Sequence, residues 1–194
     1  SLLTYMATMQ TLSGIDPEPI GNAHFVHVPY NTFTTKDGFV VIAVITDAFW
    51  EALLDVVDVE SLRDPKFSKS IDRLKNQAFI EGELNKVLST KTSDFWVGAL
   101  NKAKVPCGPI NSFSQALNDE QVQHRDMIVE VEHPDGGTVK MPGNPVKLSY
   151  TNEDTYSPPP HLGSHTKEIL KEWGGYDDKI IQALIDKKII QSIN

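Results

Sequence analysis

The fold is decided by the stretch YNTFTTKDGFVVIAVI, residues 30–45. Two runs rich in β-forming residues flank the tripeptide Lys36-Asp37-Gly38, and Asp-Gly is a strong signal for a hairpin turn. The spacing predicts strands over residues 30–35 and 39–45. The second run is apolar from Val40 to Val44, so we expect this strand at the centre of a sheet.

Helical patterns follow the hairpin. Thr46 can cap a helix whose apolar side chains are Phe49, Trp50, Leu53, Leu54 and Val57. Amphipathic spacing predicts further helices over 70–88, with Ile71, Leu74, Ala78, Leu84 and Leu88 aligned, and over 93–103, with Phe95, Trp96 and Leu100 aligned. Short helices are expected over 113–117 and 121–125. The segment 105–110 holds two prolines and is too proline-rich for a helix.

Helix and turn patterns also occur toward the two ends of the chain. Apolar residues at helical spacing over 2–12 end at Ser13-Gly14. A second hairpin is predicted from strands over 128–132 and 138–141, and residues 142–160 form a connector. Ser164 can cap a helix that reaches Trp173, and a last apolar helix begins at Asp177. Helices that alternate with antiparallel hairpins predict an α+β fold.

Composition narrows the classes of function. The chain has 26 acidic and 18 basic residues and a net charge of −8, which disfavours binding to a nucleic-acid backbone. No apolar run approaches the roughly 20 residues that a membrane helix needs. Cys107 is the single cysteine, which fits a reducing compartment. We therefore expect no nucleic-acid or membrane partner and a cytoplasmic location, with mitochondria or peroxisomes as eukaryotic alternatives.

One loop stands out as a candidate site: GNAHFVHVPY, residues 21–30. Gly21-Asn22 opens the loop, His24 and His27 lie three residues apart, and Pro29-Tyr30 leads into the first strand. It could be a substrate loop whose backbone amides and His24 face a ligand, or a structural loop with surface histidines. A metal site would need further ligands, and none is close in sequence.

Other reactive side chains leave two interpretations open. Cys107 could be a nucleophile, since thiolates attack acyl groups, or a buried and inert cysteine. His161 and His165 could be loop and cap residues or could contact a partner. No dinucleotide-binding, P-loop, zinc-protease or nucleophile-elbow motif is present in the sequence.

Four segments, in order, resemble the class III CoA-transferases. This CaiB/BaiF family includes formyl-CoA transferase, carnitine CoA-transferase and 2-methylacyl-CoA racemase. The resemblance is carried by the loop just quoted with Phe33 and Asp37-Gly38, by VPCGPI (105–110), by GNPVKLS (143–149) and by PPHLGSHT (159–166). Lys104 stands where the family usually has glycine, and Phe25 and His27 depart from its commoner loop residues.

The resemblance implies an architecture for a longer protein. The family combines a Rossmann-like large domain, built from both chain ends, with a small domain, and two subunits interlock in a homodimer. Residues 1–20 would then be an inter-domain linker helix, 21–126 the small domain, and 127–194 the return segment to the large domain. We expect the start at Ser1 to be a cut inside that longer chain, of which this is the C-terminal portion.

The resemblance also implies a chemistry. An aspartate attacks an acyl-CoA thioester, a mixed anhydride and then an enzyme thioester form, and a second carboxylic acid takes the CoA. That aspartate lies upstream in the family, so no catalytic residue is expected in this chain; neither Asp16 nor Asp37 matches its motif. The expected partners are acyl-CoA and a small carboxylic acid, with no metal and no permanently bound cofactor, because the CoA thioester is itself a substrate.

The substrate-binding role would belong to a loop that closes over the site. The resemblance maps this loop to Asn22, Ala23, His24, Phe25, Val26, His27 and Val28. Two alternatives stay open: a 2-methylacyl-CoA racemase of the same family, and a non-catalytic assembly module. In each case this chain by itself is expected to be inactive and to associate through its apolar terminal helices.

Overall fold

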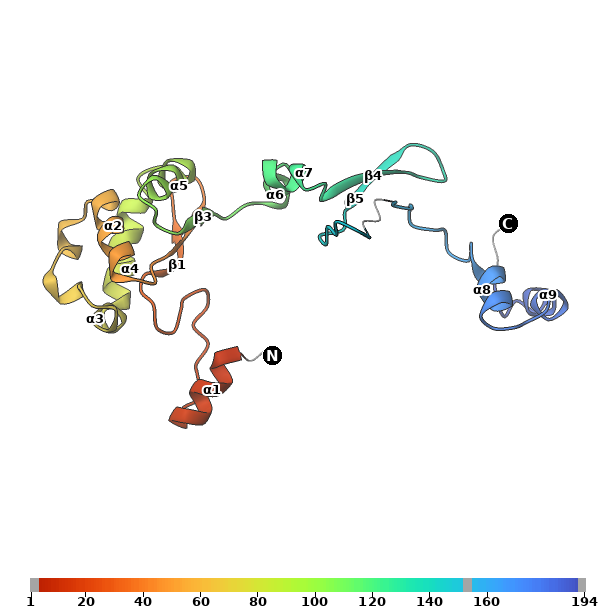
Figure 1. Ribbon diagram of the computed structural model, residues 1–194, viewed down its shortest axis with the longest axis horizontal. Coiled ribbons are helices and arrows are strands. Elements are labelled where there is room, and N and C mark those ends of the chain that lie inside the picture. Colours follow the sequence, from red (N-terminus) through yellow and green to blue (C-terminus); the bar gives the residue numbers. More distant parts are fainter. Residues whose placement is uncertain (1–3, 152–154, 192–194) are drawn as a thin grey trace. The chain divides into compact units, whose positions relative to one another are not determined.

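A computed structural model describes residues 4–151 and 155–191 (Figure 1). Its contacts divide the chain into two compact units, Ser1–Asn111 and Ser112–Asn194, which are described separately below. Helices alternate with two small antiparallel sheets, so the predicted α+β class is confirmed. The domain boundaries expected at residues 20 and 126 rest on the family resemblance and stay predictions.

The predicted first hairpin forms the centre of the N-terminal unit. Strand β1 (Tyr30–Thr34) pairs with β2 (Phe39–Ala43), and Tyr30 lies opposite Ala43. Every second residue of the β2 run, namely Val40, Ile42 and Val44, is buried. One face of the hairpin is therefore core, as the alternation of side chains along a strand requires.

The proline-rich segment after residue 105 supplies a strand that the sequence did not predict. Strand β3 (Cys107–Pro109) pairs antiparallel with β2, with Cys107 opposite Ile42, and gives the sheet order β1-β2-β3. Strand β2 is therefore central, as expected. Pro109 is tolerated because β3 is an edge strand, where one side of the backbone needs no ladder hydrogen bond.

Helices α2, α4 and α5 pack with this sheet to form the core. Helix α2 (Asp47–Val57) begins as predicted, because the Thr46 hydroxyl accepts a hydrogen bond from the Phe49 amide. Helix α4 (Gln77–Leu88) contacts β1, and α5 (Ser93–Lys102) contacts β2 and β3. Their buried residues join the sheet in one cluster that includes Trp50, Leu53, Leu54, Val57, Ile80, Leu84, Leu88, Trp96 and Leu100.

The single helix predicted over residues 70–88 is wrong. The chain forms α3 (Ser70–Lys75) and α4, and these are separated at Asn76. The Asn76 side-chain amide donates to the Asp72 carbonyl, a local bond that competes with helix continuation. The break leaves Ile71 and Ala78 exposed and brings Ile80 into the core.

Two smaller differences concern the same unit. Phe95 was expected on the buried face of its helix but is exposed, while Trp96 and Leu100 are buried. Two 3₁₀ turns, η1 (Glu60–Leu62) and η2 (Pro65–Phe67), lie between α2 and α3 and bury Leu62 and Phe67.

The C-terminal unit contains the second predicted hairpin. Strand β4 (Ile128–Glu132) pairs with β5 (Thr138–Pro142). The two short helices that precede it, α6 (Phe113–Leu117) and α7 (Glu120–His124), confirm the prediction to within a residue. Val131 and Ile181 are the buried hydrophobic residues among the described residues of this unit.

Helices α8 (Thr166–Glu172) and α9 (Asp178–Asp186) contact each other near the end of the described chain. The predicted Ser164 cap is wrong, because the Ser164 hydroxyl donates to the His161 carbonyl and His165 precedes the helix. Asp177 does cap α9, accepting from the Ile180 amide. No helix among the described residues is long and apolar enough to cross a membrane.

Candidate functional site

The loop over residues 22–28 is anchored to the core at its C-terminal end. Val28 is fully buried, and its carbonyl accepts a hydrogen bond of 3.0 Å from Nε of Arg73. The following Pro29 carbonyl accepts from the Val44 amide at 2.8 Å. The loop therefore enters strand β1 from a position that both the sheet and α3 hold in place.

Arg73 is a buried cation that joins four segments of the N-terminal unit. Besides Val28, its guanidinium donates to the carbonyls of Phe67 and Ser68 at 3.0 Å each and to Asp47 Oδ1 at 2.8 Å. It also lies 5.2 Å from the ring centre of Trp50. A buried charge is tolerated when its donors are satisfied in this way, and a guanidinium offers five of them.

His24 lies inside the loop and folds back onto it. Its Nδ1 accepts hydrogen bonds from the backbone amides of Val26, at 3.0 Å, and His27, at 3.2 Å. These two amides, which the sequence suggested could face a ligand, are thus occupied by the loop's own imidazole. The other ring nitrogen, Nε2, lies 3.4 Å from the Tyr5 hydroxyl of helix α1 (Thr4–Ser13).

An aromatic cluster surrounds the His24 ring. The ring centre lies 4.6 Å from that of His27, 5.0 Å from that of Tyr30 and 6.2 Å from that of Tyr5. Burial lowers the pKa of His24 below its ordinary value, and the neighbouring His27 lowers this pKa further. Both effects disfavour the charged imidazole.

The remaining loop residues divide into half-buried and exposed positions. Ala23, Phe25 and His27 are half-buried, whereas Asn22 and Val26 are exposed. Asn22 donates to the Thr32 hydroxyl at 3.4 Å. Nδ1 of His27 is buried and has no hydrogen-bond partner among the described residues. Val26 is therefore the apolar side chain that the loop presents to its surroundings.

The environment of Cys107 favours the inert interpretation. The thiol is half-buried on β3, and burial raises its pKa above the ordinary value. Its Sγ lies 3.4 Å from Asn101 Oδ1, which is an acceptor and does not stabilise a thiolate. A raised pKa lowers the fraction of reactive thiolate, so this residue has no sign of activation.

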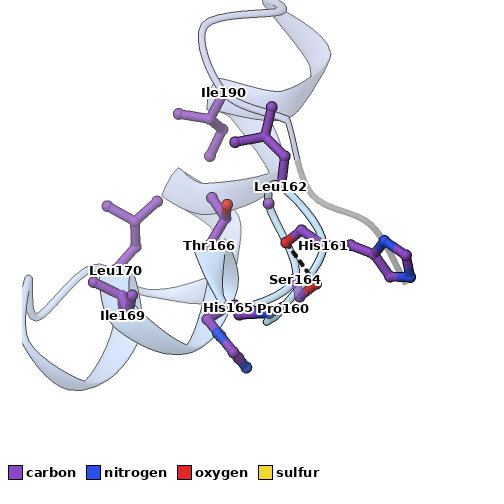
Figure 2. Close-up of a pocket in the computed structure, with 10 residues that line it drawn as sticks. Pro160, His161, Leu162, Ser164, His165, Thr166, Ile169, Leu170 and Ile190 are labelled. Carbon is purple, nitrogen blue, oxygen red and sulfur yellow. Dashed lines mark hydrogen bonds between the residues drawn. The ribbon is translucent and has the colours of Figure 1, made fainter. Parts of the chain in front are cut away.

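A surface depression with a volume of about 510 Å³ lies in the C-terminal unit. Residues 160–166 line it together with Ile169, Leu170 and Ile190. Figure 2 shows the imidazoles of His161 and His165 turned away from the apolar side chains. Nε2 of His161 instead lies 3.1 Å from Asp135 Oδ1. These histidines therefore do not converge on a reactive centre in this unit.

Neither Asp16 nor Asp37 lies in surroundings that would make its carboxylate a catalytic group. Asp16 is exposed. Asp37 Oδ1 accepts from the Ser93 amide at 2.7 Å and from the Ser93 and Thr35 hydroxyls, so it links the hairpin turn to the start of α5. Among residues 4–151 and 155–191, no three His, Cys, Asp or Glu side chains are grouped so that they could hold a metal ion.

Two residues of the loop's setting were not found from the sequence. Arg73 was not singled out within its predicted helix, and Tyr5 carried no signal beyond its place in an apolar helix. Helical spacing gave no signal for Arg73, because it lies about 200° around the helix from Ile71 and outside the stripe that Ile71 and Leu74 define. Tyr5 required the tertiary structure, because its partner His24 is 19 residues away.

Comparison with known proteins gives a consistent result across sequence and structure. The profile of CoA-transferase family III matches residues 1–166. Human succinyl-CoA:glutarate CoA-transferase is 30% identical over 189 residues, which are 97% of this chain and 43% of the human protein. Acetyl-CoA:oxalate CoA-transferase of Acetobacter aceti is 32% identical over 169 residues, 86% of this chain and 42% of that protein.

A solved structure shares the fold. A CaiB/BaiF family protein from Brucella suis superposes with a TM-score of 0.74 at 28% sequence identity, over 88% of this chain and 44% of the other. The chain therefore spans less than half the length of the relatives that it matches.

Proposed function

Because this chain belongs to CoA-transferase family III, we propose that it is part of an enzyme that moves coenzyme A between two carboxylic acids. The observation that supports this most is the match of 97% of the chain to a relative named for succinyl-CoA and glutarate. The proposed substrates are an acyl-CoA and a small carboxylic acid. The CoA thioester is a substrate, and no resident cofactor is part of the proposal.

The proposed reaction needs a carboxylate nucleophile that this chain does not supply. An aspartate outside the chain attacks the thioester carbonyl, the C–S bond breaks, and a mixed anhydride and the CoA thiolate form. The thiolate then attacks the aspartyl carbonyl of the anhydride, which releases the donor acid and leaves an enzyme thioester. The acceptor carboxylate finally takes over the CoA through the reverse pair of steps.

Within that reaction we assign the loop over residues 22–28 to substrate binding. Water must be kept away from the anhydride, and a loop anchored at one end and exposed in its middle can cover a site in this way. The Arg73 bond to Val28 supplies the anchor, and Val26 is the exposed position. Residues 127–194 would return to a Rossmann-like large domain in an interlocked homodimer, as the family resemblance implies.

The reaction is tested on the complete polypeptide in which this chain occurs. Incubation of succinyl-CoA or acetyl-CoA with isotope-labelled glutarate or oxalate should yield a labelled CoA ester, detected by mass spectrometry. The 194-residue chain alone should yield none. Racemisation of a 2-methylacyl-CoA without any transfer would replace the proposal by the racemase alternative, and the absence of both reactions would favour an assembly module.

The loop assignment is tested by a pair of variants that differ only in charge. Val26→Asp places a carboxylate beside anionic substrates, whereas Val26→Asn has the same shape without the charge. At short range such a repulsion is worth about 1 kcal/mol in bulk water and more in a covered site, so KM for the acid should rise at least about fivefold more in Val26→Asp.

Ile110 offers a matched control for these variants. Its side chain is 49% exposed, against 44% for Val26. Its amide bonds to Phe39, so it lies at the turn end of the sheet, whereas the loop enters at the opposite end, at Tyr30. Ile110→Asp and Ile110→Asn should give equal KM values. Equal KM values for the two Val26 variants would remove the loop from the substrate site.

A further inference from the structure

We infer that His24 is the positioning residue of the loop over residues 22–28, and that it holds the loop closed as a neutral imidazole and releases it on protonation. The inference depends on the proposed function only for the statement that this loop binds substrate. The role of His24 in holding the loop rests on the contacts of His24 with its own loop and with helix α1.

The hydrogen bonds define the tautomer of the ring. Backbone amides can only donate, so the Nδ1 that faces Val26 and His27 must be the unprotonated nitrogen. A neutral imidazole then carries its proton on Nε2, which donates to the oxygen of Tyr5. His24 thus bridges two loop amides and the α1 hydroxyl, and each of its nitrogens is used.

Protonation removes this bridge. In the imidazolium both nitrogens are donors, so the Nδ1 proton would face two amide protons and both bonds would be lost. The side chains whose rings contact His24 are Tyr5, His27 and Tyr30, and none of them is a carboxylate that could offset the charge. The lowered pKa of His24 agrees with this arrangement.

Loss of the bridge changes what the loop can bind. The freed amides of Val26 and His27 can then donate to a substrate carboxylate or thioester carbonyl oxygen. In the closed state a substrate oxygen must compete with His24 Nδ1 for the same two amides. His24 therefore acts through the backbone of the loop and sets how readily that backbone meets an anionic ligand.

Substitutions at His24 and at two of its neighbours separate the hydrogen bonds made by the His24 ring from the space that the ring fills. In His24→Asn the side-chain Oδ1 takes the place of Nδ1 and can accept from both amides, but it does not titrate. In His24→Ala the acceptor is absent. Tyr5→Phe removes only the hydroxyl at Nε2, and His27→Gln removes the second titratable ring while leaving His24 in place.

The readout is amide hydrogen exchange of Val26 and His27 by NMR in the 194-residue chain without substrate, measured between pH 8 and pH 5. The protection factors should fall about fivefold in the unsubstituted chain as His24 becomes protonated, since a lost hydrogen bond is worth about 1 kcal/mol. His24→Asn should keep the protection at every pH, and His24→Ala should lack it at every pH. His27→Gln should lose it at a higher pH than the unsubstituted chain, because the ring that lowers the pKa of His24 is gone.

The tautomer provides a second, independent measurement. Ring ¹⁵N shifts of His24 at pH 8 should show a protonated Nε2 and an unprotonated Nδ1. A protonated Nδ1, or amide protection that His24→Ala leaves unchanged, would overturn the inference. Neither measurement uses acyl-CoA, so a negative transferase assay does not affect the result for His24. Conversely, a loop that is not held by His24 does not contradict the proposed transfer reaction.

Discussion

At the scale of single residues, Arg73 determines how the N-terminal unit is assembled. Its side chain is 1% exposed and bonds to carbonyls from two separate segments and to the Asp47 carboxylate. Removing the cation would take this buried donor away from the carbonyls, whereas the Asp47 carboxylate is 47% exposed and keeps Lys69 at 3.9 Å. The cost of such a loss is set by unsatisfied polar groups more than by the value of the ion pair itself.

We therefore expect Arg73→Ala to lower the free energy of unfolding by about 3–5 kcal/mol. Urea unfolding followed by tryptophan fluorescence measures this, because Trp50 and Trp96 are buried in the same unit. Arg63→Ala is the matched control: Arg63 pairs with the exposed Asp55 and Asp58 and donates to the Leu54 carbonyl, and its loss should cost about 1–2 kcal/mol. Similar losses for both variants would contradict the role given to Arg73.

The partner of Arg73 should make the stability of this unit pH-dependent. The hydrogen bond from Arg73 lowers the pKa of Asp47 below its ordinary value. A depressed carboxyl pKa stabilises the fold above the unfolded-state pKa, about 3.9, and the contribution is lost as pH falls through the lower folded-state pKa. Asp47→Asn should thus be less stable than the unsubstituted chain at pH 7, and the difference should shrink at pH 3. If the urea midpoints of the two chains differ by the same amount at pH 7 and at pH 3, this prediction is wrong.

At the scale of elements, the end of helix α5 shows a local strain that one substitution can relieve. Lys104 has φ 60°, in the left-handed region that favours glycine. Its amide bonds to the Asn101 carbonyl and the Val105 amide to the Leu100 carbonyl, the paired bonds of a Schellman motif. This motif turns the chain toward β3 and buries Val105 against the core.

We expect Lys104→Gly to raise the free energy of unfolding by about 0.5–1 kcal/mol, because the relief of strain exceeds the added freedom of the unfolded chain. Lys102→Gly, two residues earlier at the exposed end of the helix, should lower it by about the same amount. Thermal or urea unfolding of the two variants should show opposite signs. A loss of stability in Lys104→Gly would mean that its side chain has an unrecognised role.

At the scale of the whole chain, the two units differ in how much apolar surface they bury. All buried hydrophobic residues among those described lie in the N-terminal unit, apart from Val131 and Ile181. The C-terminal unit leaves Phe113 90%, Leu162 89% and Trp173 86% exposed. Covering such side chains on association removes apolar area from water, which is favourable by about 1.5–3 kcal/mol for each large side chain that becomes fully buried.

The 194-residue chain should therefore self-associate as its concentration rises, through its C-terminal unit. Sedimentation velocity or light scattering between micromolar and near-millimolar concentration measures the association. Replacing both Leu162 and Trp173 with serine should weaken it, whereas Val26→Asn in the other unit should leave it unchanged. A monodisperse monomer over the whole range would show that these side chains do not drive association.

The sequence by itself determined most of the local structure. The two hairpins, the capped start of α2 and the short helices α6 and α7 were predicted from turn residues, strand alternation and capping side chains. Each of these signals acts over a few neighbouring residues, so it can be read along the chain. The family was likewise recognised from short ordered motifs, whereas the role of the loop over residues 22–28 stays a prediction.

Only the tertiary structure decided which polar groups meet across the fold. Strand β3 forms because its backbone pairs with β2, which places Cys107 opposite Ile42. The loop is held because Arg73 bonds to the Val28 carbonyl, 45 residues away in the sequence. The inward turn of His24 needs its neighbours on α1 and β1. Such contacts depend on long-range packing and on the burial of charge, neither of which leaves a periodic trace in the sequence.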